Sequence, residues 1–374
     1  MDIFNKEKIN SSYQKDLDLA KALAIVFMIW VHVNEYYQTL AIEGGVYNRV
    51  VEFLGSPFSA PIFIILLGVG IVYSRRSTAK YLFNRGITLL LLGYGLNIVM
   101  DLIPNTIIAI RTNDMSYIQS GLESIWGIDI LAFSGLAFLF FSLIKKFNIS
   151  NKGLFGIWCA LMTLNIFLRG TTVENKIINI ICRGIWGTDE LSWFPFLSWI
   201  TFAILGYYFG QILIRCTNKT VLYKNILFVT APLSVMLWIY SYVNNVRFGA
   251  FGALYQTEYY HQDVMGNIVL CVFALFWISL LHFVYQYIPE IIKRSINRWS
   301  KNTNLMYCIH YTIIGFSVLV LKTESYMPLQ TILLAVSIFV FTDILCIFIN
   351  KAKSKKLCKE YTKNEYAILK NIQN

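Results

Sequence analysis

The sequence is poor in charged residues, which make up 14% of its 374 positions, whereas hydrophobic residues make up 56%. Soluble domains carry roughly 25% charged residues, so this composition excludes an ordinary water-soluble domain. The apolar residues are grouped in runs close to the ~20 residues that span a bilayer as a helix. Because lipid offers no partners to backbone polar groups, we expect an all-α integral membrane protein that crosses the bilayer several times.

The chain also lacks the marks of a disulfide-bonded, zinc-binding or secreted protein. Its seven cysteines form no CxxC pair, so neither a disulfide framework nor a metal site is expected. The N-terminal segment is rich in acidic residues and has no small-residue cleavage site, so we expect it to be retained. No inverted repeat of the kind found in many transporters is visible.

Hydropathy predicts about ten transmembrane helices in a domain that covers residues 19–350. The predicted spans are 19–40, 57–73, 81–103, 125–144, 153–169, 193–214, 222–243, 264–288, 303–322 and 328–350. Basic residues fall on alternate loops and in the tail 351–374, so the positive-inside rule places this tail and the N-terminal segment 1–18 in the cytoplasm. The net charge of +11 then suits an anionic inner leaflet better than nucleic acid.

Four predicted outer loops are longer than a minimal turn. They lie near residues 41–56, 104–124, 170–192 and 244–263 and contain Trp, Tyr, Gly and charged side chains. Long loops on a rigid scaffold commonly carry binding residues, so these loops are expected to form an extracytoplasmic lid or an acceptor cleft. We expect a multi-pass protein of the plasma membrane.

The first predicted span, DLDLAKALAIVFMIWVHVNEYY, contains a lysine and a histidine eleven positions apart, Lys21 and His32. Eleven positions make about three turns, which places both side chains on one helix face about 16 Å apart. Glu35 follows His32 at i,i+3 and is expected to orient it, so that the imidazole can act as a general base. Ionisable groups inside a bilayer are costly and mark reaction centres or substrate paths. A histidine that only bonds a neighbouring helix is the structural alternative.

The order of motifs along the chain resembles the transmembrane acyltransferase superfamily. The first span is similar to its opening signature of a basic residue, ten residues and a histidine. The likeness continues through SAPIFIILLGVGIVYSRR, NRGITLLLLGYGLN, WGIDILAFSGLAFLF, WFPFLSWITFAILGYYFGQIL and NTNLMYCIHY. Asp18, FPFLSW and GLAFLF favour the heparan-alpha-glucosaminide N-acetyltransferase-like branch, with acyltransferase three as the related branch. Lys21 departs from the usual arginine and leaves a point charge in place of a planar fork.

The resemblance implies transfer of an acyl group, in particular acetyl, from cytoplasmic acetyl-CoA or another acyl-CoA as co-substrate. Its phosphates would meet the cations at the inner ends of the first three spans, because charge-assisted contacts to phosphate are strong. These cations are Lys21, Arg75, Arg76 and Arg85. Ordinary positive-inside bias explains Arg75 and Arg76 equally well. His310 would line the donor tunnel or bond across helices.

The same resemblance implies a hydroxyl or amine acceptor on an extracytoplasmic glycan or cell-envelope sugar. Asp101, Asp129 and Arg169 lie at predicted outer helix ends, where they would orient the acceptor or snorkel towards the interface. Some members of the heparan-acetylating branch place the catalytic histidine further towards the lumen, and His261 is the candidate for that position. The base is therefore His32 or His261, which would remove a proton or carry the acyl group as an acyl-imidazole.

A polytopic transporter or flippase of a small or lipid-linked substrate would share the ten spans and the buried charges. The ordered motifs and the lack of a repeat favour the enzyme, although fold-level likeness does not establish function. A sensor or scaffold with a degenerate site is a third interpretation, suggested by Lys21. The expected partners are acyl-CoA, the sugar acceptor and the lipid bilayer, without nucleic acid, and a second copy of the chain is a candidate partner for a homodimer.

Overall fold

The computed structural model describes residues 3–42, 44–247, 249 and 259–372. These residues form helices, turns and two isolated β-bridges, which confirms the expected all-α class. The helical elements in chain order are α1 (Lys15–Tyr37), the 3₁₀ turn η1 (Leu40–Ile42), α2 (Val46–Gly55), α3 (Ala60–Tyr73), α4 (Ala79–Asn97), the π-helical turn η2 (Ile98–Leu102), α5 (Ile103–Thr112), α6 (Ser116–Ser124), α7 (Ile130–Lys146), α8 (Asn151–Leu168), α9 (Lys176–Trp186), α10 (Phe196–Leu213), α11 (Lys219–Val243), α12 (Val264–Tyr285), α13 (Glu290–Lys301), α14 (Thr303–Ser317) and α15 (Pro328–Ile372).

Within the described part of the chain, seven helical stretches are long and apolar enough to cross a membrane. They are Val46–Tyr73, Ala79–Thr112, Asn151–Leu168, Phe196–Leu213, Lys219–Val243, Val264–Tyr285 and Pro328–Lys355. The other three predicted spans correspond to α1, α7 and α14. Charged and polar side chains interrupt the apolar face of α1, whereas α7 and α14 have 17 and 15 residues. At 1.5 Å per residue these two helices are shorter than the ~30 Å hydrocarbon core.

Short helices occupy much of the predicted outer loops. Helix α2 lies within 41–56, α5 and α6 fill most of 104–124, and α9 lies within 170–192. Helix α4 runs without interruption through η2 into α5, so the third predicted span, 81–103, continues as helix past its predicted end. Pro104 follows the π-helical turn, and because proline cannot donate a backbone hydrogen bond it accounts for the local change of pitch.

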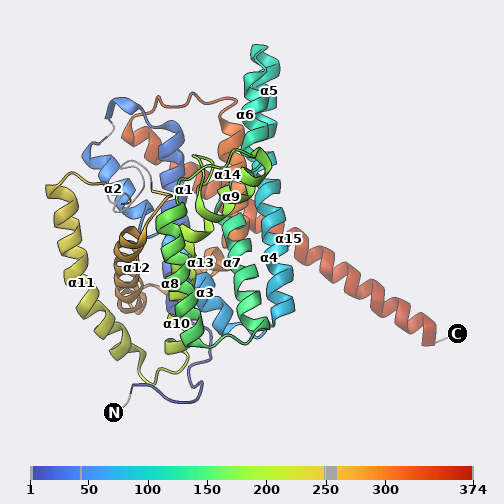
Figure 1. The fold of residues 1–374 in the computed structure, drawn as a ribbon. Helices are drawn as coiled ribbons and strands as arrows, with labels where there is room; N and C mark the ends of the chain where they lie inside the picture. The colour runs from blue at the N-terminus through green and yellow to red at the C-terminus, as the bar shows by residue number, and fades with distance from the viewer. Residues whose placement is uncertain (1–2, 43, 248, 250–258, 373–374) are drawn as a thin grey trace.

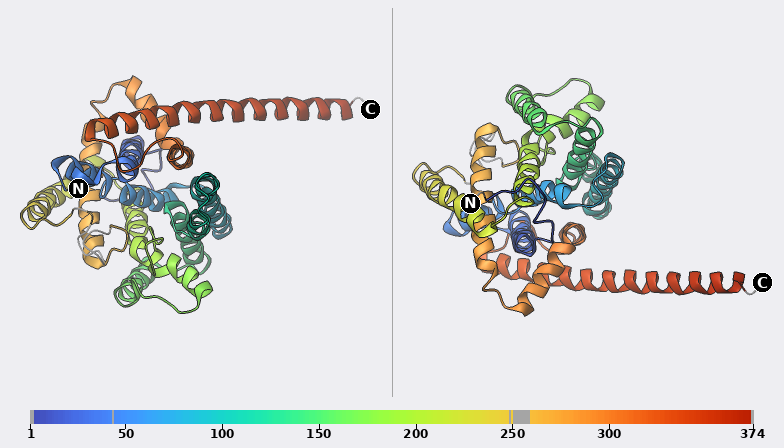
Figure 2. Two further views of the ribbon diagram at one scale, coloured as in Figure 1. Left: turned by 90° about the horizontal axis from the view of Figure 1, so that it is seen from above. Right: turned by 90° about the horizontal axis from the view of Figure 1, so that it is seen from below.

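Helix α1 lies at the centre of the bundle. It contacts α2, α3, α12, α13, α14 and α15, and the views in Figures 1 and 2 show it surrounded by them. Ala20, Ala22, Ala24 and Ile25 are at most 1% exposed. The three alanines are small enough to let neighbouring helices approach closely on several sides. The helix that carries Lys21 and His32 is therefore held by packing around most of its circumference.

Helices α3 and α10 are in direct backbone contact. A Cβ atom added to Gly68 would collide with the carbonyl oxygen of Ala203, and one added to Gly206 would collide with that of Ile65. Glycine at both positions is therefore required by the close approach. A second closely packed pair, α4 and α7, lies beside them.

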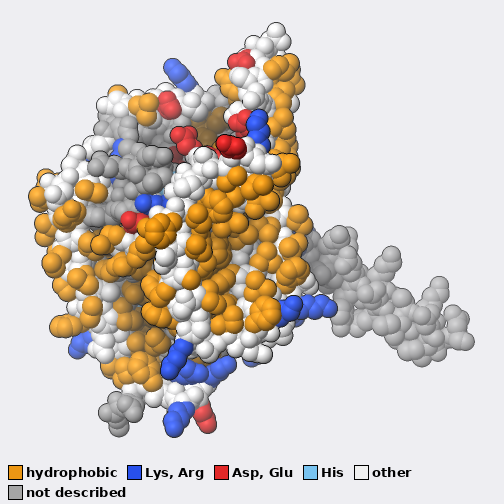
Figure 3. Space-filling view, in the orientation of Figure 1, with side chains coloured by type: hydrophobic (Ala, Val, Ile, Leu, Met, Phe, Trp, Pro, Cys, Tyr) orange, Lys and Arg blue, Asp and Glu red, His pale blue; other side chains and the backbone are white. Residues whose placement is uncertain are grey.

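The two ends of the bundle differ in charge. The N-terminal segment bonds to residues 214–217 after α10, and in Figure 1 it lies at the bottom of the molecule. On the face seen in Figure 3, lysine and arginine side chains gather at this bottom end, most of the acidic ones lie nearer the top together with several basic ones, and a largely hydrophobic surface lies between. An excess of basic side chains at one end is the distribution that the positive-inside rule describes. Helix α15 leaves the bundle as a single long helix (Figure 2).

Candidate active site

His32 lies on α1 and is bonded through both ring nitrogens to helix α14. Its Nδ1 is 3.1 Å from Nε2 of His310, and its Nε2 is 2.9 Å from the hydroxyl of Tyr311. The two imidazole rings are nearly parallel, with an interplanar angle of 6° and centroids 5.4 Å apart. His32 is 8% exposed and His310 is fully buried. The two histidines therefore form one hydrogen-bonded unit between helices that are far apart in sequence.

Helix α14 presents this unit because Tyr307, His310 and Tyr311 are spaced i, i+3 and i+4 and so share one face. The Nδ1 of His310 lies 3.0 Å from the carbonyl oxygen of Met306 in its own helix. Tyr307 donates a hydrogen bond of 3.2 Å to Asp129, and its ring packs on that of Tyr311. Of the two alternatives expected for His310, the structure shows the bond across helices, to His32.

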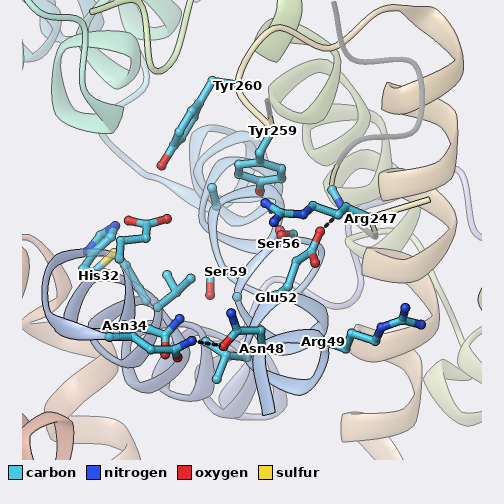
Figure 4. A pocket seen from close by; sticks show the side chains of 18 of the residues that line it. His32, Asn34, Asn48, Arg49, Glu52, Ser56, Ser59, Arg247, Tyr259 and Tyr260 are labelled. Atoms are coloured by element: carbon cyan, nitrogen blue, oxygen red, sulfur yellow. Dashed lines mark hydrogen bonds between the residues drawn. The ribbon is translucent and has the colours of Figure 1, made fainter. Parts of the chain in front are cut away.

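A cavity of about 710 Å³, which we call the outer cavity, lies on the side of His32 that faces away from the basic end. Its wall comes from α1, α2, the end of α11, residues 259–260 and α14. Aromatic, amide and hydroxyl side chains dominate the polar part of the wall, including Asn34, Gln38, Asn48, Ser56, Ser59, Trp238, Tyr242, Tyr259, Tyr260, Tyr307 and Tyr311. In Figure 4 the hydroxyl of Tyr260 points into the cavity on the side of His32.

Glu35 lines the outer cavity, one helical turn beyond His32. The sequence predicted that its carboxylate would orient the imidazole, but this prediction is wrong. Both nitrogens of His32 are bonded to α14 instead, one to His310 and one to Tyr311. Glu35 is left facing the cavity, where its carboxylate can accept hydrogen bonds from a bound molecule.

A second cavity of about 380 Å³, the inner cavity, lies closer to the basic end. Lys21, Arg76 and Arg85 line it together with apolar side chains such as Phe63 and Phe138. The guanidinium of Arg85 stands over the ring of Phe138, 5.1 Å from its centroid. Three cations beside an apolar channel suit a ligand with a phosphate end and a thin, less polar arm.

Arg75 is exposed, and it is absent from the described residues that line the inner cavity. Of the four cations predicted to converge at the inner ends of the helices, three line the inner cavity. Arg75 does not, and its position fits the alternative of ordinary positive-inside bias. Lys21 lies beside a hydrogen-bonded carboxylate. Asp18, one turn before it, accepts hydrogen bonds from Tyr13 at 2.8 Å and from Ser300 at 2.6 Å. These two hydrogen bonds hold the carboxylate of Asp18 in place one turn from the lysine ammonium.

The two cavities share part of their walls. Tyr307 and Ile130 line both of them, and Tyr307 belongs to the same face of α14 as the partners of His32. Gly70 lines the inner cavity, and a Cβ atom added to it would meet no atom within 4 Å. Tyr307 is thus part of the wall of both the basic inner cavity and the polar outer cavity, next to the histidine pair.

Four residues predicted to bind the acceptor lie elsewhere. Asp129 caps the N-terminus of α7 by accepting from the backbone of Ala132 at 2.7 Å, and Asp101 lies in η2. Arg169 donates to the backbone carbonyl of His261 at 3.0 Å, which ties α8 to the segment before α12. Within the described residues, none of these four lines the outer cavity. The prediction placed them by depth alone, and hydrogen bonds within the protein account for Asp129 and Arg169.

His261 is 2% exposed and packs against Gly187, where an added Cβ atom would meet its ring at 2.6 Å. Burial, with a further contribution from the cation of Arg169, lowers the pKa of His261 to about 4. Within the described residues, His32 lines the outer cavity and His261 does not. Position therefore favours His32 over His261 as the candidate base.

An ion pair and a carboxylate–imidazole contact link distant parts of the chain. Arg298 on α13 makes a two-pronged bond to Asp343 on α15, at 3.0 and 2.6 Å. Asp16 at the start of α1 is 2.7 Å from Nδ1 of His282 on α12. Sequence reasoning could not pair these residues, because the partners are separated by dozens of positions. It also missed the aromatic pair Tyr259 and Tyr260 of the outer cavity, although two adjacent tyrosines in an outer loop were a usable signal.

The part of the chain that the structure describes contains no group of three or more His, Cys, Asp or Glu residues that could hold a metal ion. Comparison of the sequence with known protein families gives a match. The profile of the acyltransferase domain of type 3 matches residues 14–351. No curated protein and no solved structure matches the chain.

Proposed function

The chain belongs to the acyltransferase 3 family, and from this premise we propose that it moves an acyl group, in particular acetyl, from cytoplasmic acyl-CoA to a sugar outside the membrane. One observation carries the proposal. A cation-lined cavity and a polar cavity meet at Tyr307, beside the bonded pair of His32 and His310. Transfer between two substrates on opposite sides of a membrane needs an entrance for each substrate and a reactive group where the two entrances meet.

The inner cavity supports the acyl-CoA part of the proposal. Lys21, Arg76 and Arg85 supply cations for phosphate oxygens, and the apolar wall accommodates the pantetheine arm. A thioester held by such an arm is carried away from the cations and towards Tyr307. The depth of His32, about 16 Å beyond Lys21 along α1, suits the reactive end of an extended donor.

The chemistry assigned to His32 is proton removal or acyl transfer through its Nε2, the nitrogen on the side of Tyr311. In the first case, the acceptor oxygen or nitrogen bonds to the thioester carbon as its proton passes to His32. The carbon–sulfur bond then breaks, and the proton neutralises the departing CoA thiolate. In the second case, Nε2 itself bonds to the acyl carbon, the carbon–sulfur bond breaks and CoA departs as a thiolate. The acceptor then bonds to the acyl carbon, the bond from that carbon to Nε2 breaks, and the acceptor proton neutralises the thiolate. Asn34, on the wall of the outer cavity, is the proposed donor to the developing oxyanion.

The outer cavity supports a sugar acceptor. Its tyrosines and Trp238 offer flat apolar faces with polar edges, and its amides and hydroxyls match the donors and acceptors of sugar hydroxyl groups. Glu35 is proposed to accept a hydrogen bond from the acceptor. A glycan or cell-envelope sugar reached from outside the plasma membrane completes the proposal. Placement in the heparan-acetylating branch stays a prediction.

Incubation of the purified protein with radiolabelled acetyl-CoA and a panel of sugars tests the proposal. Release of CoA together with labelled sugar is the expected result. Label that accumulates on the protein, is removed by hydroxylamine and is absent in His32→Ala would assign the acyl-carrier role to His32. Movement of acetyl-CoA or sugar without any covalent transfer would instead support a transporter, and absence of both binding and transfer would support a degenerate site.

A further inference from the structure

Building on the proposed function, we propose that His310 is a positioning residue that fixes the tautomer of His32 and takes up the proton displaced from it. The geometry behind this inference is the continuous row of hydrogen bonds from Tyr311 through His32 and His310 to the carbonyl of Met306. His310 is fully buried, and it is absent from the described residues that line the two cavities. It therefore acts on the reaction through His32.

The carbonyl of Met306, at the end of this row, determines which atom donates and which accepts in each hydrogen bond. A carbonyl oxygen can only accept, so the Nδ1 of His310, 3.0 Å from the oxygen of Met306, carries a proton. In a neutral imidazole the other nitrogen is then an acceptor, which assigns the lone pair to Nε2 of His310. His32 must donate to that lone pair over 3.1 Å, so its own proton is on Nδ1.

This assignment leaves the basic lone pair of His32 on Nε2, where the hydroxyl of Tyr311 donates to it over 2.9 Å. Both Tyr311 and His32 line the outer cavity. An acceptor hydroxyl or amine that takes the place of the Tyr311 hydroxyl in this hydrogen bond reaches the lone pair from the outer cavity. With the opposite tautomer, Nε2 would carry a hydrogen and could not act as a base.

His310 also supplies a second proton site. When His32 accepts the acceptor proton on Nε2, its Nδ1 proton can pass along the 3.1 Å bond to Nε2 of His310. His310 then carries both ring protons, with one held by the Met306 carbonyl dipole, and His32 is neutral again. The reverse transfer returns the proton to the CoA thiolate as the carbon–sulfur bond breaks.

A neutral imidazole suits this position better than the carboxylate that usually orients a catalytic histidine. His310 is surrounded by Tyr307, Tyr311 and His32, whose rings lie within 5.5 Å of its own. A permanent charge in this buried site would carry the desolvation penalty of an ion. A neutral ring with a backbone carbonyl behind it avoids that cost in the resting protein.

Nitrogen NMR of histidine side chains tests the assignment without an assay of activity. The chain contains four histidines, so protein labelled with ¹⁵N-histidine gives few signals, and loss of signals in His32→Gln identifies those of His32. We expect the wild-type protein in lipid nanodiscs at neutral pH to carry the His32 proton on Nδ1. A proton on Nε2 would overturn the proposal.

Two variants of His310 extend the test, with Thr312→Val as the matched control. Thr312 lies on the same helix, and its hydroxyl bonds the carbonyl of Cys308. In His310→Leu, His32 is expected to shift to the Nε2–H form, and kcat of acyl transfer is expected to fall about 100-fold or more with little change in KM for the donor. In His310→Gln, the amide oxygen can accept from His32, so the tautomer is expected to be retained and part of the rate recovered.

These readouts separate failure of the inference from failure of the proposed function. An Nδ1–H tautomer that persists in a monodisperse His310→Leu protein with an unchanged transfer rate would overturn the role of His310 and leave the acyltransferase intact. A tautomer that shifts as expected in a protein without any acyl transfer would retain the positioning role and overturn the proposed reaction. The control is expected to keep both the wild-type tautomer and the wild-type rate.

Discussion

His32 differs from a histidine that only packs, because both of its ring nitrogens are bonded to one neighbouring helix and its outer edge faces a cavity. Lys21 is the second residue that the account depends on. Its place on the wall of the inner cavity, one turn beyond the fixed carboxylate of Asp18, gives it a role at the donor end. These two positions lead to separate predictions, one for chemistry and one for binding.

Replacement of the proposed base should abolish acyl transfer with little effect on folding. We expect His32→Ala to lower the transfer rate by about 10²–10⁴-fold, the usual cost of losing a general base. The affinity for acetyl-CoA, measured by calorimetry in detergent, should stay near the wild-type value because the donor cations are untouched. A monodisperse variant that binds acetyl-CoA and transfers at the wild-type rate would move the base elsewhere.

The cation of Lys21 should contribute mainly to donor binding. We expect Lys21→Ala to weaken CoA binding by about 10- to 100-fold, as for loss of a charge-assisted hydrogen bond. Lys21→Arg should retain or improve binding, because guanidinium contacts phosphate through a planar fork. Lys152→Ala, which removes an exposed lysine at the start of α8, is the matched control in the same calorimetric titration. Equal affinities for the two alanine variants would remove Lys21 from the donor site.

At the scale of the helices, glycine has two different functions in α3. Gly68 lets the helix contact the backbone of α10, whereas Gly70 leaves open space on the wall of the inner cavity. The two positions are only two residues apart, and no rule based on sequence alone distinguishes them. The difference becomes visible once the neighbouring helix is known.

Filling the space beside Gly70 should obstruct the donor without disturbing the fold. We expect Gly70→Leu to raise KM for acetyl-CoA about 10-fold or more, because the added side chain occupies volume in the cavity. Gly95→Leu is the matched control, since a Cβ atom there also meets no atom within 4 Å and the residue does not line the inner cavity. Gly68→Ala, by contrast, should lower the thermal midpoint. An unchanged KM in Gly70→Leu would exclude the inner cavity as the donor path.

The sequence predicted helices well and their lateral contacts poorly. Each of the ten predicted spans overlaps a helix of the structure, because apolar runs and charged boundaries are local features. The partner of His32 was predicted to be Glu35, since helical spacing relates only residues of one helix. In the structure the partner of His32 is His310, almost 280 positions away, through a contact between α1 and α14. Such contacts depend on how helices pack, and the spacing along one helix does not determine that.

At the scale of the whole molecule, the proposed reaction needs a defined orientation in the membrane. The N-terminal segment, the basic side chains seen at the bottom of Figure 3 and the inner cavity belong to one end of the bundle, and the outer cavity lies further towards the other. Acyl-CoA is a cytoplasmic metabolite, so the basic end must face the cytoplasm for the donor path to be used. The positive-inside rule predicts this orientation independently of the cavities.

Cysteine labelling of intact cells tests the orientation. In a background without the native cysteines, single cysteines at Glu190 and Glu324 should react with a membrane-impermeant reagent, and one at Ser354 should react only after permeabilisation. The physical reason is the excess of lysine and arginine in the loops predicted to be cytoplasmic. Reaction of the Ser354 position in intact cells would contradict the arrangement and remove the cytoplasmic donor site.

Transfer across a sealed membrane tests the central claim, that the two cavities form one path past His32. Proteoliposomes sorted to a single orientation would receive radiolabelled acetyl-CoA on the side of the basic end and a sugar acceptor on the opposite side. We expect labelled sugar on the acceptor side and CoA on the donor side, and we expect His32→Ala to form neither product. Labelled product that forms only when donor and acceptor share one side would contradict it.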